Sequence, residues 1–347
     1  ALGTGALAGQ NIQLTALNDM ANALLTWESS RMWNIGIDFT LFNKLNITGE
    51  WYEQRVFDVL MQPDIPLSVG LNKPWQNVGR IRNRGWEFMV DYRDRVGNIN
   101  YNINFNLSDV RNKLMTEAGT QTSTLQKNIK GNPVQALYGY EAIGYYQTEE
   151  DLANNPAAVG TPALGDIMYK DQNKDGKINE ADEVMIGSVI PRFTYGLNLG
   201  AEYKGIGLDL FFQGVGKVDG YLSDSAIQPF YSGGTAQEQH KDYWTPENRN
   251  ASFPRLTYGE SGNNYQRSSF WRKDASYLRL KNIQLSYAIP AKLVKKYNIE
   301  RMRFYVAGQN ILTFDNFWKG YDPETPAGQG RIYPQVKTYT IGLEIKF

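Results

Sequence analysis

The end of the chain alternates between apolar and polar side chains, and it finishes on an aromatic residue. From Val336 to Phe347, Lys337 aside, every second position is apolar: Tyr339, Ile341, Leu343, Ile345 and Phe347. The positions between them are small, polar or charged: Thr338, Thr340, Gly342, Glu344 and Lys346. Because a β-strand points successive side chains to opposite faces, we expect a strand with one apolar face and one polar face. Such a final strand is typical of a membrane-embedded β-barrel, although a sheet in a soluble protein is the alternative from this segment alone.

The same period of two recurs along the chain. Runs with apolar residues at every second position lie at 33–41, 86–93, 99–108, 193–203 and 206–213, with Phe211 as an exception. Each run is about ten residues or slightly shorter, close to the length that a tilted strand needs to cross hydrocarbon. Aromatic residues stand at several run ends, as at membrane interfaces: Trp33, Trp86, Tyr92, Tyr203 and Phe347. The repeated pattern predicts an all-β fold, a transmembrane antiparallel β-barrel.

We expect about nine membrane strands in this chain. They are predicted at 29–42, 45–60, 77–94, 99–111, 192–203, 206–217, 274–289, 302–313 and 336–347. Tight turns such as Lys204-Gly205 join some of them, and a short link at 290–301 begins at Pro290. The remaining connections, at 61–76, 112–191, 218–273 and 314–335, are long. Barrels of this class carry their long loops outside the cell, so we expect these connections to be extracellular.

The expected strand number does not close a barrel. Bacterial single-chain barrels have even strand numbers, and an open sheet edge in lipid leaves backbone groups without partners. We therefore interpret the chain as the C-terminal part of a larger barrel, with residues 1–28 as the tail of an extracellular loop and 29–347 as barrel strands with long extracellular loops. The alternative is a small complete barrel with one more strand near 6–15. The start of the chain has no signal-peptide features, so we expect that a signal was removed or precedes this piece.

Composition argues against several functions. Lysine and arginine together number 36, as do aspartate and glutamate, so no net charge draws the chain to nucleic acid. There is no cysteine, which excludes disulfides and thiol chemistry. No stretch is long and apolar enough for a transmembrane helix. No Gly-x-Ser-x-Gly motif occurs, and the single histidine, His240, is expected on a loop surface. We therefore predict that the chain is not an enzyme.

Residues 171–182 follow the spacing of an EF-hand calcium loop. The predicted ligands are five side chains, Asp171, Asn173, Asp175, Asn179 and Asp182, and the backbone carbonyl of Lys177. Gly176 stands where the chain must turn sharply, and the aspartate at the last position resembles dockerin-type loops. Ca²⁺ needs six or more converging oxygens, so the spacing predicts a structural calcium ion that holds the 112–191 loop. The alternative is a polar turn in which Asp and Asn side chains cap their own backbone.

Aromatic residues are dense in the long connections. The candidates for ligand contact are Tyr231, Tyr243, Trp244, Trp271 and Trp318. With neighbouring amides such as Asn263 and Asn264, these rings suit oligosaccharides, whose C–H faces are apolar, and they suit oligopeptides equally well. Tyr and Trp also anchor protein interfaces, so packing against a lid or within the loops is an equal alternative.

Short motifs spread over the whole chain resemble those of the SusC/RagA-type TonB-linked outer-membrane transporters. They are Trp27-Glu28, Trp33-Asn34-Ile35-Gly36, Asn77-Val78-Gly79 to Asn83-Arg84-Gly85-Trp86-Glu87, the Asp171–Asp182 loop, Tyr243-Trp244-Thr245-Pro246-Glu247-Asn248, Phe253-Pro254-Arg255, Tyr277-Leu278-Arg279-Leu280-Lys281-Asn282, Gly308-Gln309-Asn310, Gly320-Tyr321-Asp322-Pro323-Glu324 and the terminal Phe347. The resemblance implies the C-terminal part of a 22-stranded barrel with an N-terminal plug, active import through TonB, and a SusD-like lipoprotein over the outer mouth.

These observations together predict the C-terminal barrel part of an importer of glycans or peptides in the outer membrane of a Gram-negative cell. Its expected partners are the SusD-like lipoprotein, TonB through the missing N-terminal part, the remaining barrel and plug, and outer-membrane lipid; nucleic acid is not among them. A passive porin or adhesin-type barrel is the alternative. A plug with a TonB-contacting segment distinguishes the two, because a passive pore needs neither.

Overall fold

The computed structural model describes residues 2–7, 10–15, 22–63, 65–116, 125–258 and 262–347. Its main feature is one antiparallel sheet of nine long strands. They are β3 (Ser29–Leu41), β4 (Leu45–Met61), β5 (Gln76–Val96), β6 (Ile99–Leu114), β12 (Phe193–Tyr203), β13 (Ile206–Gly216), β16 (Tyr277–Ala288), β17 (Arg301–Asp315) and β18 (Thr338–Lys346). The nine predicted membrane strands are confirmed, with small shifts at their ends.

Each strand of the sheet pairs with the next one along the sequence, from β3 at one edge to β18 at the other. The turn between β12 and β13 shows why tight hairpins form here: Lys204 and Gly205 have φ values of 48° and 85°. Positive φ at both central residues matches the right-handed twist of two paired strands. The ladder then runs without interruption from Tyr203↔Ile206 to Phe193↔Gly216.

Shorter elements fill the connections. The short strands are β1 (Leu2–Leu7), β2 (Gln10–Thr15), β7 (Gln126–Lys127), β8 (Ala136–Gly139), β9 (Ala142–Tyr145), β10 (Ile167–Tyr169), β11 (Val184–Gly187), β14 (Asp219–Tyr221) and β15 (Arg272–Asp274). The helices are α1 (Glu149–Asn154) and α2 (Ala291–Val294), with 3-10 turns η1 (Leu67–Val69), η2 (Glu180–Asp182), η3 (Asp224–Ala226), η4 (Tyr231–Gly233), η5 (Glu238–Lys241), η6 (Asn263–Tyr265), η7 (Ser269–Trp271) and η8 (Lys295–Tyr297).

Two details differ from the sequence-based expectations, and a third adds to them. β1 and β2 pair with each other as a hairpin outside the nine-stranded sheet, in the region expected to be a loop tail. The strand expected from 274 begins at Tyr277, because Asp274 pairs with Asp219 in the separate β14–β15 ribbon. The short link predicted to begin at Pro290 is present, and it contains α2 and η8.

The chain divides into two compact units. Unit 1 comprises Ala1–Asn34, Tyr52–Arg84 and Arg111–Ala136, and unit 2 comprises Ile35–Trp51, Gly85–Val110 and Leu137–Phe347. Unit 1 has a small core in which Met61 and Leu114 are buried, with Val59, Ile81 and Val134 packed against them. It contains the parts of β4, β5 and β6 furthest from their tight turns, and β5 at 21 residues is far longer than a membrane crossing of about ten residues requires.

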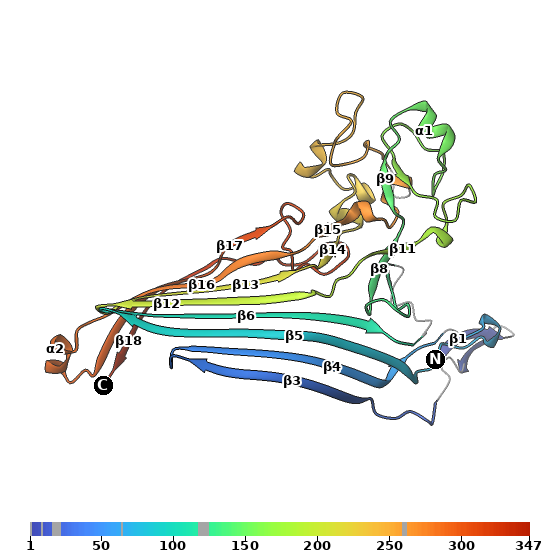
Figure 1. Cartoon of the computed structure of the whole chain (residues 1–347). Helices are drawn as coiled ribbons and strands as arrows, with labels where there is room; N and C mark the ends of the chain where they lie inside the picture. Colours follow the sequence, from blue (N-terminus) through green and yellow to red (C-terminus); the bar gives the residue numbers. More distant parts are fainter. Residues whose placement is uncertain (1, 8–9, 16–21, 64, 117–124, 259–261) are drawn as a thin grey trace. The chain divides into compact units, whose positions relative to one another are not determined.

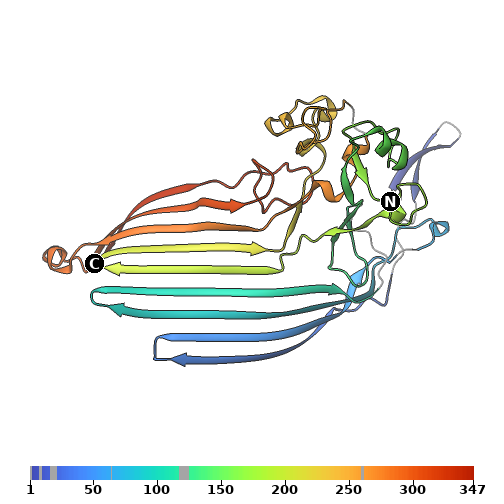
Figure 2. The ribbon, with the colours of Figure 1, turned by 45° about the horizontal axis from the view of Figure 1, so that its top comes forward.

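Unit 2 contains most of the strand length and the largest loops. Figures 1 and 2 show β12, β13, β16 and β17 running side by side, with α2 and the C-terminus at one end of these strands and the long loops at the other. We name these the short-turn end and the long-loop end. The strand-like segment predicted at 138–146 is present as β8 and β9 at the long-loop end, outside the nine-stranded sheet.

Candidate functional site

The nine-stranded sheet has one apolar face and one polar face. Ile341 on β18 pairs with Val306 on β17, and Leu343 pairs with Phe304, so that these four side chains share one face. All four are exposed, and Ile341 retains 85% of its accessible surface. A water-facing sheet does not present such a continuous apolar surface, whereas a sheet in lipid requires one. We name this the lipid face.

The polar face is built from amides. On β6, Asn100, Asn102, Asn104 and Asn106 stand opposite the alternating positions of β12. Gly200 on β12 lies directly opposite Asn102, and a Cβ atom at Gly200 would come within 2.3 Å of the Asn102 Oδ1 atom. Glycine therefore makes room for the amide. The result is a wall of donors and acceptors of the kind that lines a water-filled or plugged lumen.

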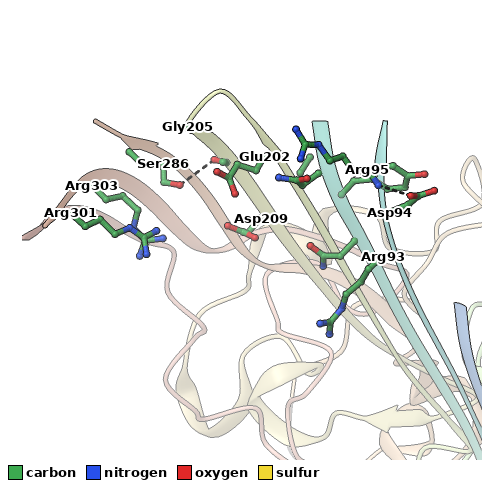
Figure 3. Close-up of a pocket in the computed structure, with 15 residues that line it drawn as sticks. Arg93, Asp94, Arg95, Glu202, Gly205, Asp209, Ser286, Arg301 and Arg303 are labelled. Carbon is green, nitrogen blue, oxygen red and sulfur yellow. Dashed lines mark hydrogen bonds between the residues drawn. The ribbon is translucent and has the colours of Figure 1, made fainter. Parts of the chain in front are cut away.

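A hollow of about 560 Å³ lies on the polar face near the short-turn end. The charged residues of its lining, labelled in Figure 3, come from β5, β12, β13 and β17: Arg93, Asp94, Arg95, Glu202, Asp209, Arg301 and Arg303. Two of these arginines form ion pairs with carboxylates that do not line the hollow. Arg93 pairs with Asp91 at 3.1 Å, and Arg303 pairs with Glu344 at 2.7 Å. The hollow thus presents charges of both signs beside apolar and small side chains such as Tyr101, Ala201 and Ala288.

The loops at the long-loop end pack around an aromatic core. Trp271 is completely buried, and its ring contacts Phe253, Trp318, Tyr265 and Phe270 at centroid distances of 4.7–6.0 Å. Its indole nitrogen donates to the Asn264 carbonyl at 2.8 Å. Aromatic side chains of this size contribute much of the burial energy of a fold. We name Trp271 and these four ring partners the aromatic core.

Polar groups around the aromatic core are paired internally. Asp166 is 3% exposed and accepts two hydrogen bonds from Arg255, at 2.6 and 3.0 Å, and a third from the Asn264 side chain. Asn263 donates to the Ile167 carbonyl and accepts from the Ala158 N–H. Both asparagines are buried, so their amides, expected beside a ligand, tie the loops together instead.

His240 is also buried, and the expectation of a surface histidine is wrong. Only 2% of its surface is exposed, its Nδ1 atom accepts from the Gln237 N–H at 3.0 Å, and its ring meets Phe253 edge-on. Burial holds the pKa of the His240 imidazole below its usual value, because the charged form loses its hydration. A neutral, enclosed imidazole of this kind is a structural residue of the loop cluster.

Arg279 fastens the last loop to the polar face of β16. Its guanidinium, 1% exposed, donates to Asp322 and to Glu324, each at 2.6 Å, and to the Thr313 hydroxyl at 3.0 Å. The Tyr277 hydroxyl donates to Glu324 at 2.8 Å. Tyr277 and Arg279 come from one motif of the sequence, and Asp322 and Glu324 come from another, so the structure shows that ion pairs and hydrogen bonds join the two motifs.

The 171–182 loop is closed by hydrogen bonds from its own backbone. Asp171 accepts from the N–H groups of Lys174 and Gly176, at 2.6 and 2.8 Å. Asp182, fully buried, accepts from Gln172 and Asn179, each at 2.9 Å. Gly176 has a φ of +80°, which a side chain would strain.

The other predicted ligands of this loop cap neighbouring residues. The Oδ1 atoms of Asn173, Asp175 and Asn179 accept from the backbone N–H two residues further on, at 2.9 Å in each case. Within the described ranges, no three His, Cys, Asp or Glu side chains gather in a metal-binding group. The polar-turn alternative predicts these capping bonds, and calcium binding by the loop stays a prediction.

The five aromatic candidates for ligand contact divide by burial. Trp244, Trp271 and Trp318 are at most 7% exposed, and their rings pack inside the loops. Tyr231 and Tyr243 are partly exposed. Ligand contact by these residues stays a prediction, and the two tyrosines are the ones that a ligand can reach without rearrangement of the loops.

The two faces of the sheet define a class of protein, the transmembrane β-barrel. The family model described as "TonB dependent receptor-like, beta-barrel" matches residues 3–311. The chain belongs to this family, which consists of outer-membrane receptors and transporters rather than enzymes. In the described part of the chain, no helix has both the length and the apolar character to traverse a membrane.

Curated relatives agree with this assignment. The TonB-dependent receptor P3 of Formosa agariphila is 30% identical over 97% of this chain and 36% of its own length. The TonB-dependent receptor SusC of Bacteroides thetaiotaomicron is 27% identical over 94% of this chain and 32% of its own length. The chain thus spans about a third of the length of the relatives it matches. Among solved structures, the RagAB peptide importer in its "open-open" state has the same fold, with a TM-score of 0.80 at 23% identity, over 100% of this chain and 38% of that one.

Proposed function

We propose that this chain is part of the barrel wall of a TonB-dependent outer-membrane importer whose cargo is an oligosaccharide or an oligopeptide. The observation that carries the proposal is the pairing of a lipid face with a polar face of amides and charges on one nine-stranded sheet of this family. A wall of this kind encloses a wet lumen, and it performs no bond chemistry itself. The proposed importer works with TonB, with a plug inside the lumen and with a SusD-like lipoprotein at the long-loop end, which we place outside the cell.

Two comparisons support the cargo class. SusC is a curated relative of this chain, and the RagAB structure is described as a peptide importer. We propose that Tyr231 and Tyr243, the accessible aromatic candidates, contact cargo or the lipoprotein, while Trp244, Trp271 and Trp318 hold the loops in place.

Uptake of labelled oligosaccharides and oligopeptides by cells that carry the full-length protein tests the proposal. Import through TonB requires energy, so uptake is expected to stop when the TonB-contacting segment is deleted or when the proton gradient is collapsed. Uptake that continues unchanged under both treatments would show the alternative, a passive porin. Cells without any uptake of either cargo, but with adhesion to surfaces, would support the adhesin alternative.

We also propose that the 171–182 loop binds a structural Ca²⁺ ion. The proposed ligands are Asp171, Asn173, Asp175, Asn179, Asp182 and the Lys177 carbonyl. The spacing of the six residues and the turn at Gly176, whose φ is +80°, support the proposal, because a calcium loop of this type turns sharply at that position. When bound, the ion would supply a fixed point for the long 112–191 connection.

The calcium loop is joined to the rest of unit 2 through Glu141. Gln172 and Lys170 donate to the Glu141 carboxylate at 2.8 and 3.0 Å, and these bonds lower the pKa of Glu141. An ion that orders residues 171–182 would therefore also fix the segment between β8 and β9.

A further inference from the structure

A cavity of about 260 Å³ lies at the long-loop end of β13 and β16, entirely within unit 2. Residues from the connection before β12, the end of β13, β14, the start of β16 and the last long loop line it. Most of the lining is aliphatic: Val189, Pro191, Val215, Val218, Ala275, Pro323, Pro326 and Ala327. We name this cavity the aliphatic pocket.

The aliphatic pocket lies on the polar face of the sheet. Val215 and Asp209 are an even number of residues apart on β13, so their side chains point to the same face. Asp209 lines the hollow of the polar face. Tyr277 on β16 pairs with Val215 and also lines the pocket. The pocket is therefore on the side of the wall that faces the lumen in the proposed importer, away from lipid tails.

Both carboxylates of the lining are already paired. Asp219 forms an ion pair with Arg272 at 2.7 Å. Glu324 accepts a hydrogen bond from Arg279 at 2.6 Å and another from the Tyr277 hydroxyl at 2.8 Å. A cationic ligand would have to displace these partners, so the pocket suits an uncharged, apolar group.

One polar side chain of the lining lacks a partner. Thr325 is 6% exposed, and its Oγ1 atom has no hydrogen bond within the described part of the chain. The Thr325 N–H donates to the Asp322 carbonyl at 2.9 Å, which fixes the residue in its loop. A buried hydroxyl without a partner costs free energy, and it can both donate and accept. The N–H or C=O group of a peptide bond in a ligand would supply the missing partner.

Backbone hydrogen bonds hold the walls of the pocket together. The Ala275 N–H donates to the Val218 carbonyl at 2.9 Å, which joins the segment after β15 to the end of β13. The Gly328 N–H donates to the Tyr221 carbonyl at 3.0 Å, which joins the last long loop to β14. A preformed site loses little conformational freedom on binding, so more of the contact energy appears as affinity.

We propose that the aliphatic pocket binds an apolar side chain of an oligopeptide cargo, with the Thr325 hydroxyl bonded to the adjacent peptide group. An oligopeptide offers both groups that the pocket requires, an uncharged aliphatic side chain and a polar backbone beside it. An oligosaccharide carries hydroxyls around its rings, and these would lose their hydration against aliphatic walls. The inference rests on the proposed function and selects the oligopeptide from its two cargo classes.

Two pools of short peptides serve as probes, and the full-length protein is purified in detergent with the partners that accompany it. Both pools are randomised over glycine, serine, threonine and asparagine, and one pool carries a single leucine where the other carries serine. We expect the wild type to bind the leucine pool roughly tenfold more tightly, since burial of a leucine side chain shifts an equilibrium by about that factor or more.

Two variants change the pocket itself. Ala327→Leu fills it, and the affinity for the leucine pool is expected to fall roughly tenfold, to that of the serine pool. Thr325→Val keeps the shape of the side chain and removes the hydroxyl, so the affinity for the leucine pool should fall about two- to tenfold. The matched controls, Ala236→Leu and Thr235→Val, make the same changes at exposed positions and are expected to keep wild-type affinity.

Thermal unfolding shows whether each variant is folded, and should Ala327→Leu fail to fold, Thr325→Val decides alone. Equal affinity of the wild type for the two pools would overturn the inference, as would an unchanged leucine preference in Ala327→Leu. Release of a copurifying lipoprotein by Ala327→Leu, with the peptide preference unchanged, would assign the pocket to that partner instead.

Uptake by cells separates this inference from the proposed function. Cells that take up labelled oligosaccharides and neither peptide pool would overturn the inference and leave the proposed importer intact. Uptake that persists without the proton gradient would contradict the proposed function itself, and the binding measurements would still decide the role of the pocket.

Discussion

Arg279 on β16 and Asp322 in the last long loop are joined by a hydrogen bond of 2.6 Å across 43 positions of sequence. The arginine is 1% exposed, and it also holds Glu324. A guanidinium enclosed in this way stabilises the loop position only while both carboxylates remain beside it, because an unpaired buried charge is costly.

Replacement of this arginine should release the last loop. For Arg279→Met we expect the free energy of unfolding of the loop cluster to fall by roughly 2 kcal/mol, since several charge-assisted bonds are lost. Limited proteolysis between residues 316 and 335 measures the effect. Arg303→Met is the control, because its pair with Glu344 is partly exposed and such pairs contribute about 0–1 kcal/mol. Equal protease resistance of both variants would contradict the assigned role.

The aromatic core should respond to truncation of its central ring. Trp271→Ala is expected to destabilise the loop cluster by about 3–5 kcal/mol, because a completely buried ring leaves a cavity. Tyr258→Ala, at a position that is 85% exposed, should cost less than about 0.5 kcal/mol. Thermal unfolding followed by tryptophan fluorescence separates the two, and similar losses for both would argue against a packed core.

Acid should weaken the loop cluster through His240. Its folded pKa is lowered by burial, so the unfolded chain takes up a proton more readily than the folded one. This stability contribution is therefore fully present above the unfolded pKa of about 6.5 and is lost as the pH falls below it. The unfolding temperature of the loops, measured at pH 7.5 and 5.5, should fall more for the wild type than for His240→Gln. An equal fall in both would assign the acid effect to carboxylates.

Calcium removal should loosen one loop selectively. With the proposed ion bound, a chelator is expected to increase protease cleavage within residues 112–191 of the wild type. Asp171→Ala/Asp175→Ala should show the high cleavage rate with or without calcium. Glu149→Ala/Glu150→Ala, two acids in the helix α1 of the same connection, provides a matched loss of charge and should respond like the wild type. A wild type that is indifferent to chelator would leave a self-capped polar turn as the better interpretation.

The lipid face and the polar face should tolerate charge differently. Ile341→Arg, in the last strand, is expected to cost about 2–4 kcal/mol if the position lies near the membrane midplane. Thr340→Arg, one residue away on the polar face, should be accepted with little loss. Heat-modifiable migration of the full-length barrel measures folding, and an equal response of both variants would mean that the faces were assigned wrongly.

The nine long strands could be predicted because each has lipid on one side and water on the other. Each strand therefore alternates between apolar and polar residues, and this period of two can be recognised in each strand by itself. The long loops carry no such local signal. Asp166 and Arg255 are 89 positions apart, and His240 is enclosed by rings from other segments, so neither pairing nor burial follows from neighbouring residues. The motif containing Tyr277 and Arg279 and the motif containing Asp322 and Glu324 were visible in the sequence, but only the structure joins them.

The two outermost strands, β3 and β18, each have a partner on one side only within this sheet. An extended edge with free backbone donors and acceptors adheres readily to other polypeptides, and hydrocarbon cannot satisfy it. Biochemists who produce these 347 residues alone should therefore anticipate inclusion bodies and mixed oligomers after refolding. Affinity and energetics should therefore be determined on protein in which both of these edge strands are paired.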